Sequence, residues 1–323
     1  MEPTATNLAS VLPPAPQRTL QSIGAQTEEC FDARTNFVYI SDKLETEYPG
    51  THKRLTQLFD ELQIDWGEID GTKDIWLLDF MPIQLKNNAF LTYKYAPNYL
   101  KEDRYLTDSH AIGKRVLDEC FGKDCKRVDT GLTLDGGNFV ECGKYWLLTV
   151  KAISDNDHRR EQLREFVELA HGRAVFLPWV SDEPNGTNAD IYGHADGLVQ
   201  WCGRKEALMS NYHDFHPQEA ADIKNILERL GFHVTEMLFD VKHPNREYNW
   251  AYVNYLRVGR KIIVPTFGIE EDNQALDYIR KANPQCEVRG FRLRCIANNG
   301  GALQCITWNV YRPEYYPNKY QPL

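Results

Sequence analysis

Four short segments of this 323-residue chain combine an acidic or nucleophilic side chain with the glycine or proline that lets a backbone turn or approach a ligand closely. Together they hold carboxylates, an imidazole and a thiol, the groups used in general acid/base and nucleophilic catalysis. The segments are Trp76-Leu-Leu-Asp79-Phe-Met-Pro82, Leu134-Asp135-Gly-Gly-Asn138-Phe139, Gly193-His194-Ala-Asp196-Gly197 and Gly300-Gly301-Ala-Leu-Gln-Cys305-Ile-Thr307.

Each segment, taken alone, also has an ordinary structural explanation. Asp79 could cap a turn at the end of an apolar strand, and Asp135-Gly-Gly-Asn138 is typical of a hairpin turn. His194 and Asp196 stand two apart, so on an extended chain they would point to the same side and form an acid/base pair, or the histidine could be a hydrogen-bonded strand residue. Cys305 could be a buried core thiol.

A metal site is a further alternative. His213 and His216, together with His194 and Asp196, could supply ligands for zinc or iron, although their spacing matches no established motif. The chain has no Gly-x-Gly-x-x-Gly or Walker sequence, which argues against a nucleotide cofactor. We therefore expect neither a metal nor a cofactor.

The elements that must position these segments alternate between short apolar strands and amphipathic helices. Two strands followed by a helix recur along the chain, which favours an α+β or mixed-sheet α/β fold over a doubly wound parallel sheet. Strands are expected at 37–40, 89–93, 139–140, 145–150, 197–201, 206–209, 251–256, 261–264, 287–292 and 302–306. Helices are expected at 51–62, 111–120, 159–171, 218–230 and 273–281.

Composition narrows the class of protein. Hydrophobic residues make up 42% and charged residues 26%, a balance typical of a soluble chain with a full core. A net charge of −9 disfavours nucleic acid and anionic membrane surfaces as partners, and no apolar run approaches the ~20 residues of a membrane span. Eight scattered cysteines favour a reducing, cytoplasmic setting over a disulfide framework.

The predicted domain organisation is simple. Residues 1–27 are expected to form a flexible N-terminal tail without the features of a secretory signal, and residues 28–323 a single catalytic domain. The polar, turn-forming stretch at 182–190 is expected to be a functional surface loop.

In this order the four segments resemble the agmatine deiminase and bacterial peptidylarginine deiminase family of the guanidine-modifying (pentein) superfamily. The shared pattern is Trp-x-x-Asp followed by Pro, acid-Gly-Gly, Gly-His-x-Asp and Gly-Gly-x-x-x-Cys-x-Thr, and the similarity covers roughly residues 60–313. This chain departs from the usual pattern at Leu78 (usually Arg), Asp135 (often Glu) and Gln304 (often His). The resemblance implies a pentein α/β-propeller, five ββα-type modules around a pseudo-fivefold axis, with the site in the central channel.

The resemblance also implies a reaction and a set of roles. A guanidino compound would be hydrolysed to a ureido product and ammonia through a covalent amidino-thioether, without a cofactor. A bound cation and a nearby imidazolium would lower the pKa of the nucleophilic thiol. The expected catalytic residues are Cys305 as nucleophile, His194 as proton donor and base, and Asp135 as its orienting partner; the expected substrate-binding residues are Asp79 and Asp196 as a clamp, with Trp76 and Asn138.

Two other functions remain open at this stage, an amidinotransferase on the same fold and a non-catalytic guanidinium-binding or partner-binding pentein. The expected partner is a cationic guanidino small molecule or an arginine side chain, and the chain could also form a homo-oligomer. The residues around Asp79 are apolar, which favours a small guanidine lacking an α-carboxylate over free arginine.

Overall fold

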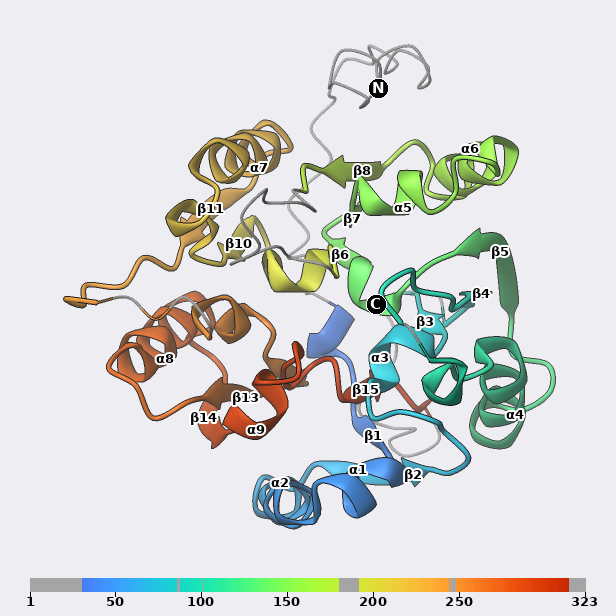
Figure 1. The fold of residues 1–323 in the computed structure, drawn as a ribbon, viewed down its shortest axis with the longest axis horizontal. Helices are drawn as coiled ribbons and strands as arrows, with labels where there is room; N and C mark the ends of the chain where they lie inside the picture. Colours follow the sequence, from blue (N-terminus) through green and yellow to red (C-terminus); the bar gives the residue numbers. More distant parts are fainter. Residues whose placement is uncertain are drawn as a thin grey trace.

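Five three-stranded sheets surround a central axis in the computed structural model, which describes residues 31–85, 88–100, 102–179, 192–243, 245 and 248–313 (Figure 1). In each sheet the middle strand is antiparallel to one neighbour and parallel to the other, and the chain reaches the parallel neighbour through helix. The repeated unit is therefore ββαβ. This confirms the expected five-module α/β propeller; of the parallel third strands, only that of the last module, at 287–292, was expected from the sequence.

The strands are short and follow one another around the ring. The first sheet contains β15 (Thr307–Val310), β1 (Phe37–Ser41) and β2 (Asp65–Ile69). The next two contain β3 (Ile83–Gln84), β4 (Phe90–Lys94) and β5 (Arg127–Thr133), and β6 (Val140–Cys142), β7 (Tyr145–Thr149) and β8 (Ala174–Leu177). The last two contain β9 (Val199–Gly203), β10 (Glu206–Met209) and β11 (His233–Glu236), and β12 (Leu256–Val258), β13 (Lys261–Thr266) and β14 (Glu287–Arg292).

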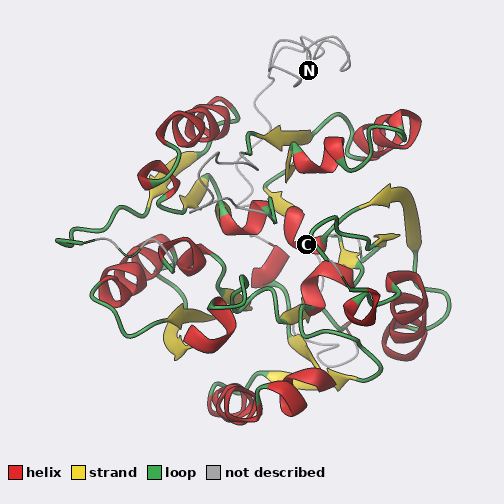
Figure 2. Cartoon of the chain, viewed as in Figure 1, coloured by secondary structure: helices red, strands yellow, loops and turns green. Residues whose placement is uncertain are grey.

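The longer helices lie on the outside of the ring (Figure 2). Each turns an apolar stripe inward; in the second helix, for example, Leu55, Leu58 and Phe59 are buried. The α-helices are α1 (Asp42–Glu47), α2 (Pro49–Glu61), α3 (Leu77–Phe80), α4 (Ser109–Phe121), α5 (Lys151–Ser154), α6 (Arg160–Leu169), α7 (Pro217–Arg229), α8 (Glu271–Ala282) and α9 (Arg294–Ala297). Short 3-10 helices are η2 (Phe31–Ala33), η3 (Asp103–Tyr105), η4 (Gly136–Asn138), η5 (Ala195–Gly197), η6 (Tyr212–Asp214) and η7 (Asn249–Val253).

The first sheet closes the ring because it joins the two ends of the described chain. Residues 37–40 of β1 pair antiparallel with residues 307–310 of β15, and β1 also pairs in parallel with β2. All five residues of β1 are buried. The strand that follows Cys305 is therefore held by the first strand of the fold.

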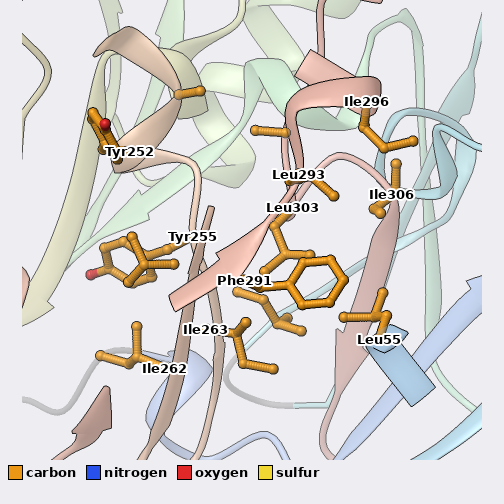
Figure 3. Close-up of a cluster of buried hydrophobic side chains, with 14 of the residues drawn as sticks. Leu55, Tyr252, Tyr255, Ile262, Ile263, Phe291, Leu293, Ile296, Leu303 and Ile306 are labelled. Atoms are coloured by element: carbon orange, nitrogen blue, oxygen red, sulfur yellow. The ribbon is translucent and has the colours of Figure 1, made fainter. Parts of the chain in front are cut away.

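The largest buried cluster supports the irregular segment that carries Cys305. Leu303 and Ile306 flank this cysteine and point into the cluster with Leu293 and Phe291 (Figure 3). Each fully buried aliphatic side chain contributes about 1.5–3 kcal/mol relative to an exposed one. The segment thus has a fixed position although it forms neither helix nor strand.

Two expected strands are wrong. In the expected 251–256 strand, residues 251–253 belong to the 3-10 helix η7 and residues 254–255 are irregular, so that only Leu256 is in a strand, β12; 302–306 is a turn that precedes β15. The reason is a long-range contact that periodicity does not show: the Asn254 side-chain Oδ1 and backbone carbonyl both accept hydrogen bonds from the backbone N–H of Gln304.

The parallel strands β2, β5, β8 and β11 were not expected from the sequence. They lie at the edges of their sheets, and β2 reads Asp-Trp-Gly-Glu-Ile, without clear alternation. The expected tail at 1–27 and loop at 182–190 lie outside the described residues. Among the described residues, no helix combines the length and apolar character needed to cross a bilayer.

Candidate active site

The structure brings together Asp79, Asp135, His194, Asp196 and Cys305, although they lie on separate segments of the chain. Each of these residues is no more than 8% exposed. Asp79 lies in α3, and Asp135 directly precedes η4. His194 directly precedes η5, Asp196 lies within η5, and Cys305 lies in the turn before β15. Buried charges in such a group must be paired or hydrogen-bonded. The ion pairs and hydrogen bonds among these five residues and their neighbours define the site.

Asp79 lies on the single-turn helix α3, where its Oδ1 accepts a hydrogen bond from the backbone N–H of Gly137 at 3.1 Å. Burial raises the pKa of Asp79 to about 6; the charge of His194 opposes the rise, and the charge of Asp135 adds to it. The carboxyl of Asp79 therefore titrates closer to neutrality than an ordinary aspartate.

His194 lies between two carboxylates. Its Nε2 is 3.2 Å from Asp135 Oδ2, and its Nδ1 is 3.7 Å from Asp79 Oδ1. Burial would lower the pKa of His194, but the charges of Asp79, Asp135 and Asp196 outweigh burial and raise it to about 9. The imidazole is therefore protonated at neutral pH.

The local conformation behind this pairing differs from the expectation. His194 and Asp196 do not lie on an extended strand: His194 precedes η5, and Asp196 lies within it. Asp135-Gly-Gly-Asn138 likewise forms the 3-10 helix η4 between β5 and β6 rather than a hairpin turn. The side chains converge through two short helices in neighbouring modules.

Asp135 accepts hydrogen bonds from two cations. The Lys151 ammonium donates to Asp135 Oδ2 at 3.0 Å, and His194 Nε2 reaches the same oxygen. Burial would raise the pKa of Asp135, but the hydrogen bonds and charges of His194 and Lys151 lower it overall. Asp135 therefore carries a full negative charge beside the imidazolium.

Asn254 links Asp196 to Cys305. Its Nδ2 donates to Asp196 Oδ2 at 2.8 Å, and its Oδ1 accepts from the Cys305 thiol at 3.4 Å. Burial, followed by the charges of Asp196 and Asp79, raises the pKa of Cys305 well above its usual value. With the protein groups alone, Cys305 is therefore a neutral thiol, and a cation bound beside it would oppose this shift.

Gly136 and Gly137 leave no room for a side chain at either position. A Cβ at Gly137 would lie 2.7 Å from His194 Nδ1, 2.9 Å from Asp79 Oδ1 and 3.2 Å from Asp196 Oδ2, and one at Gly136 would lie 2.0 Å from the Leu78 carbonyl oxygen. Three polar side chains thus converge on the bare backbone of Gly137. This is a close approach that only glycine permits.

We expect Gly137→Ala to lower kcat/KM at least about tenfold, because the added methyl must displace the imidazole or a carboxylate from its position. Overpacking of this kind costs about 1–3 kcal/mol of stability, so the melting temperature should fall as well. Gly50→Ala is the control, because that exposed helical glycine has only the end of an arginine side chain near its Cβ position. Unchanged kcat/KM in Gly137→Ala would show that the site does not function in this geometry.

Trp76 and Asn138 make structural contacts beside the site. A Cβ at Gly301 would lie 2.1 Å from the Trp76 ring, so the indole packs directly on the glycine turn before Cys305. Asn138 Oδ1 accepts the backbone N–H of Thr149 at 2.8 Å, which ties η4 to the end of β7. Their expected contact with substrate stays a prediction.

Sequence reasoning missed Lys151 and Tyr99 and gave Asn254 no role. The Tyr99 hydroxyl is 3.4 Å from His194 Nε2, and the Tyr99 ring lies 4.9 Å, centroid to centroid, from Tyr192. Asn254 stands in a stretch that resembles the family, which was the one available signal for it. Nothing in the sequence around Lys151 distinguishes it from a surface lysine.

The metal alternative finds no support. Within the described ranges, no group of three or more His, Cys, Asp or Glu side chains is arranged to hold a metal ion. His213 is exposed, and the His216 ring packs 5.1 Å from the Tyr212 ring. These histidines do not join His194 and Asp196.

A cavity of ≈ 90 Å³ lies beside the site and is lined in part by Leu78, Met81, Gly136 and Gln304. None of the five site residues lines it. Two of the three departures from the family pattern, Leu78 and Gln304, therefore face this cavity. The apolar residues around Asp79 consequently say less about the substrate than the sequence suggested.

This ring of five ββαβ modules, with its three carboxylates, histidine and cysteine, places the chain among the penteins, and solved structures agree. It superimposes on a C. jejuni agmatine deiminase variant solved with substrate bound, with a TM-score of 0.67 and 17% identity over 91% of this chain and 99% of the other. An amidinotransferase of saxitoxin biosynthesis from Microseira wollei gives a TM-score of 0.58 at 11% identity, over 89% of this chain and 97% of the other. These similarities establish the fold.

The family follows from the sequence match. Residues 33–310 match the Porphyromonas-type peptidyl-arginine deiminase family, and the chain belongs to it. A curated relative, the agmatine deiminase of Pseudomonas syringae pv. syringae, is 28% identical over 229 residues. The match spans 61% of this chain and 61% of that relative.

Proposed function

We propose that this protein deiminates a small guanidino compound, with agmatine as the best candidate, to a ureido product and ammonia through an amidino-thioether on Cys305. The observation that carries the proposal is the convergence of Asp79, Asp196 and His194 on the bare backbone of Gly137, with the Cys305 sulfur 3.9 Å from Asp196 Oδ2. Family membership and the agmatine deiminase relatives support the same reaction.

The charges of the site fit a guanidinium. Asp79, Asp135, Asp196 and the Lys151 partner Asp155 carry four negative charges when ionised, and His194 and Lys151 supply two positive charges. This excess of negative charge favours a bound cation, and carboxylates can hold the N–H donors of a guanidinium by charge-assisted hydrogen bonds. The same cation offsets the two carboxylates that raise the pKa of Cys305, so substrate binding favours the thiolate, and the thiol proton leaves to solvent.

The residues can then act in sequence. The Cys305 thiolate attacks the guanidinium carbon, and the His194 imidazolium gives a proton to the departing ammonia. This leaves a cationic amidino-thioether and a neutral histidine. His194 next removes a proton from water as it attacks, which restores the imidazolium. The adduct then collapses: the C–S bond breaks, the hydroxyl proton of the adduct passes to the departing sulfur, and the ureido product leaves with Cys305 again as the neutral thiol. Asp135 keeps the imidazole oriented through both steps.

The surroundings favour a substrate without an α-carboxylate. Lys151, the cation beside Asp135, is already paired with Asp135 and Asp155, so it is not available for a second anion. The rings of Tyr99 and Tyr192 lie about 6 Å from the His194 ring, at 6.1 and 6.2 Å. An apolar aliphatic tail fits such rings better than a carboxylate does. A cytoplasmic location belongs to the same proposal, since the seven described cysteines are free thiols.

The test is turnover on a panel of agmatine, free arginine and an arginine-containing peptide, with ammonia and ureido product both measured. We expect agmatine to give the highest kcat/KM, ammonia release to be independent of added glycine, and chelators to have no effect. Formation of amidinoglycine with release of the diamine of agmatine in place of ammonia would indicate an amidinotransferase, and binding without product on any substrate would indicate a non-catalytic pentein. Loss of activity in chelator, restored by zinc or iron, would contradict the thiolate mechanism.

A further inference from the structure

Lys151 is the first residue of α5, and its side chain is only 1% exposed. Its ammonium contacts Asp135 Oδ2 at 3.0 Å, forms a second ion pair with Asp155, and lies 5.7 Å from the centre of the Tyr99 ring. A lysine is almost never this deeply buried unless it is paired. The position of this cation therefore needs an explanation beyond a surface salt bridge.

The two ion pairs of Lys151 connect to the candidate catalytic histidine. Asp135 Oδ2 accepts from Lys151 Nζ on one side and from His194 Nε2 on the other. The result is a continuous chain of alternating charge, Asp155, Lys151, Asp135 and His194. Moving or neutralising Lys151 changes the charge and the orientation of the carboxylate that holds the imidazole.

The groups around this row of ion pairs explain why a buried cation is needed to balance the carboxylates. Asp79 approaches from α3 and Asp196 from η5, while Tyr99 and Cys305 add two neutral groups that cannot balance them. The carboxylates of Asp79, Asp135 and Asp196 would repel one another in a buried site with a single histidine cation. Lys151 lowers the pKa of both Asp135 and Asp79 through its charge.

We propose that Lys151 is a positioning residue of this site: its buried ammonium keeps Asp135 ionised and aimed at His194, so that three carboxylates remain available at once for the imidazolium and the guanidinium. This inference rests on the proposed function and adds a residue to it. A lysine that only fastened α5 to η4 would stabilise the fold without setting the ionisation of the carboxylates.

The test compares Lys151→Met with Lys151→Arg and with Lys144→Met, which removes an exposed lysine. In the parent we expect kcat/KM to rise with pH through about 6, as Asp79 ionises, and to fall through about 9, as His194 loses its proton. In Lys151→Met the acid limb should move up by about one pH unit, which by itself lowers kcat/KM about twofold at neutral pH. The loss of orientation of Asp135 and His194 should bring the total loss to at least about tenfold. Lys151→Arg should keep the parental acid limb, and Lys144→Met should match the parent throughout.

A second measurement does not depend on turnover. In a Cys305→Ala background, the carboxyl carbons of Asp79 and Asp135 can be titrated by NMR with and without Lys151→Met. Their pKa values should rise in the variant, whether or not any guanidine is a substrate. Lys151→Gln serves the same purpose if Lys151→Met does not fold.

Two results would separate the possible failures. A parent that releases no ammonia from any guanidine refutes the proposed function, and an upward shift of the carboxyl titration would still support the electrostatic role of Lys151. A parent that is active, with a variant whose acid limb and carboxyl titration both coincide with the parent, overturns the inference and leaves Lys151 as a structural residue.

Discussion

Cys305→Ala should abolish deimination, with turnover lower by about three orders of magnitude or more, while agmatine still binds. The sulfur is the one group of the site that would form a bond to the guanidinium carbon, whereas the groups expected to bind the cation, Asp79 and Asp196, are separate side chains. Alanine removes a thiol that is neutral in the unliganded site, so the charge balance there does not change. Substrate affinity should therefore stay near the parental value.

The measurement is ammonia release for turnover and calorimetry for agmatine binding, made on the same preparations. Cys295→Ala is the matched control because it removes an exposed free thiol. Activity above a few per cent in Cys305→Ala, at parental purity, would mean that another group is the nucleophile.

Asp79→Asn and Asp196→Asn should each weaken agmatine binding by about 100-fold or more. Each change removes one negative charge and one charge-assisted hydrogen bond from a buried cation, a loss of about 2–5 kcal/mol. The two variants should differ in one respect. The acid limb that we expect near pH 6 in the pH dependence of kcat/KM is assigned to Asp79, so it should disappear in Asp79→Asn and remain in Asp196→Asn.

Calorimetric titration with agmatine measures the affinity, and the pH dependence of kcat/KM separates the two carboxylates. Asp277→Asn is the control, since that carboxylate lies on the surface in an exposed pair with Arg280. If either site variant bound agmatine as tightly as the parent, that aspartate would not contact the guanidinium.

The candidate site could be predicted from the sequence to the extent that its residues stand in short motifs. Asp79, Asp135, His194, Asp196 and Cys305 were all identified this way, and the structure brings them together. Their local conformations could not be predicted. The expectation that His194 and Asp196 point to the same side assumes a strand, whereas η5 is helical. The side chains of Asp79, His194 and Asp196 converge because Gly137, in another module, has no side chain.

Lys151 and Asn254 show what single-sequence reasoning does not reach. Lys151 follows a strand in the sequence, and its burial results from Asp135 on one side and Asp155 on the other. Asn254 acts through Gln304 and Cys305, about fifty positions later. Both roles are contacts between segments that neither periodicity nor turn chemistry places side by side. The ββα pattern was predictable because it is local, but four of the five parallel edge strands, β2, β5, β8 and β11, were not.

The pairing of β15 with β1 determines when, during synthesis on the ribosome, the candidate site can assemble. Asn36 and Arg312, 276 positions apart, exchange hydrogen bonds beside this pairing, and Cys305 lies two residues before β15. Contacts so distant in sequence form late because a long loop must close first. In a nascent chain on the ribosome, Asp79, Asp135, His194 and Asp196 are therefore synthesised before Cys305 can be placed beside them. Under the proposed function, a partly synthesised copy would be inactive.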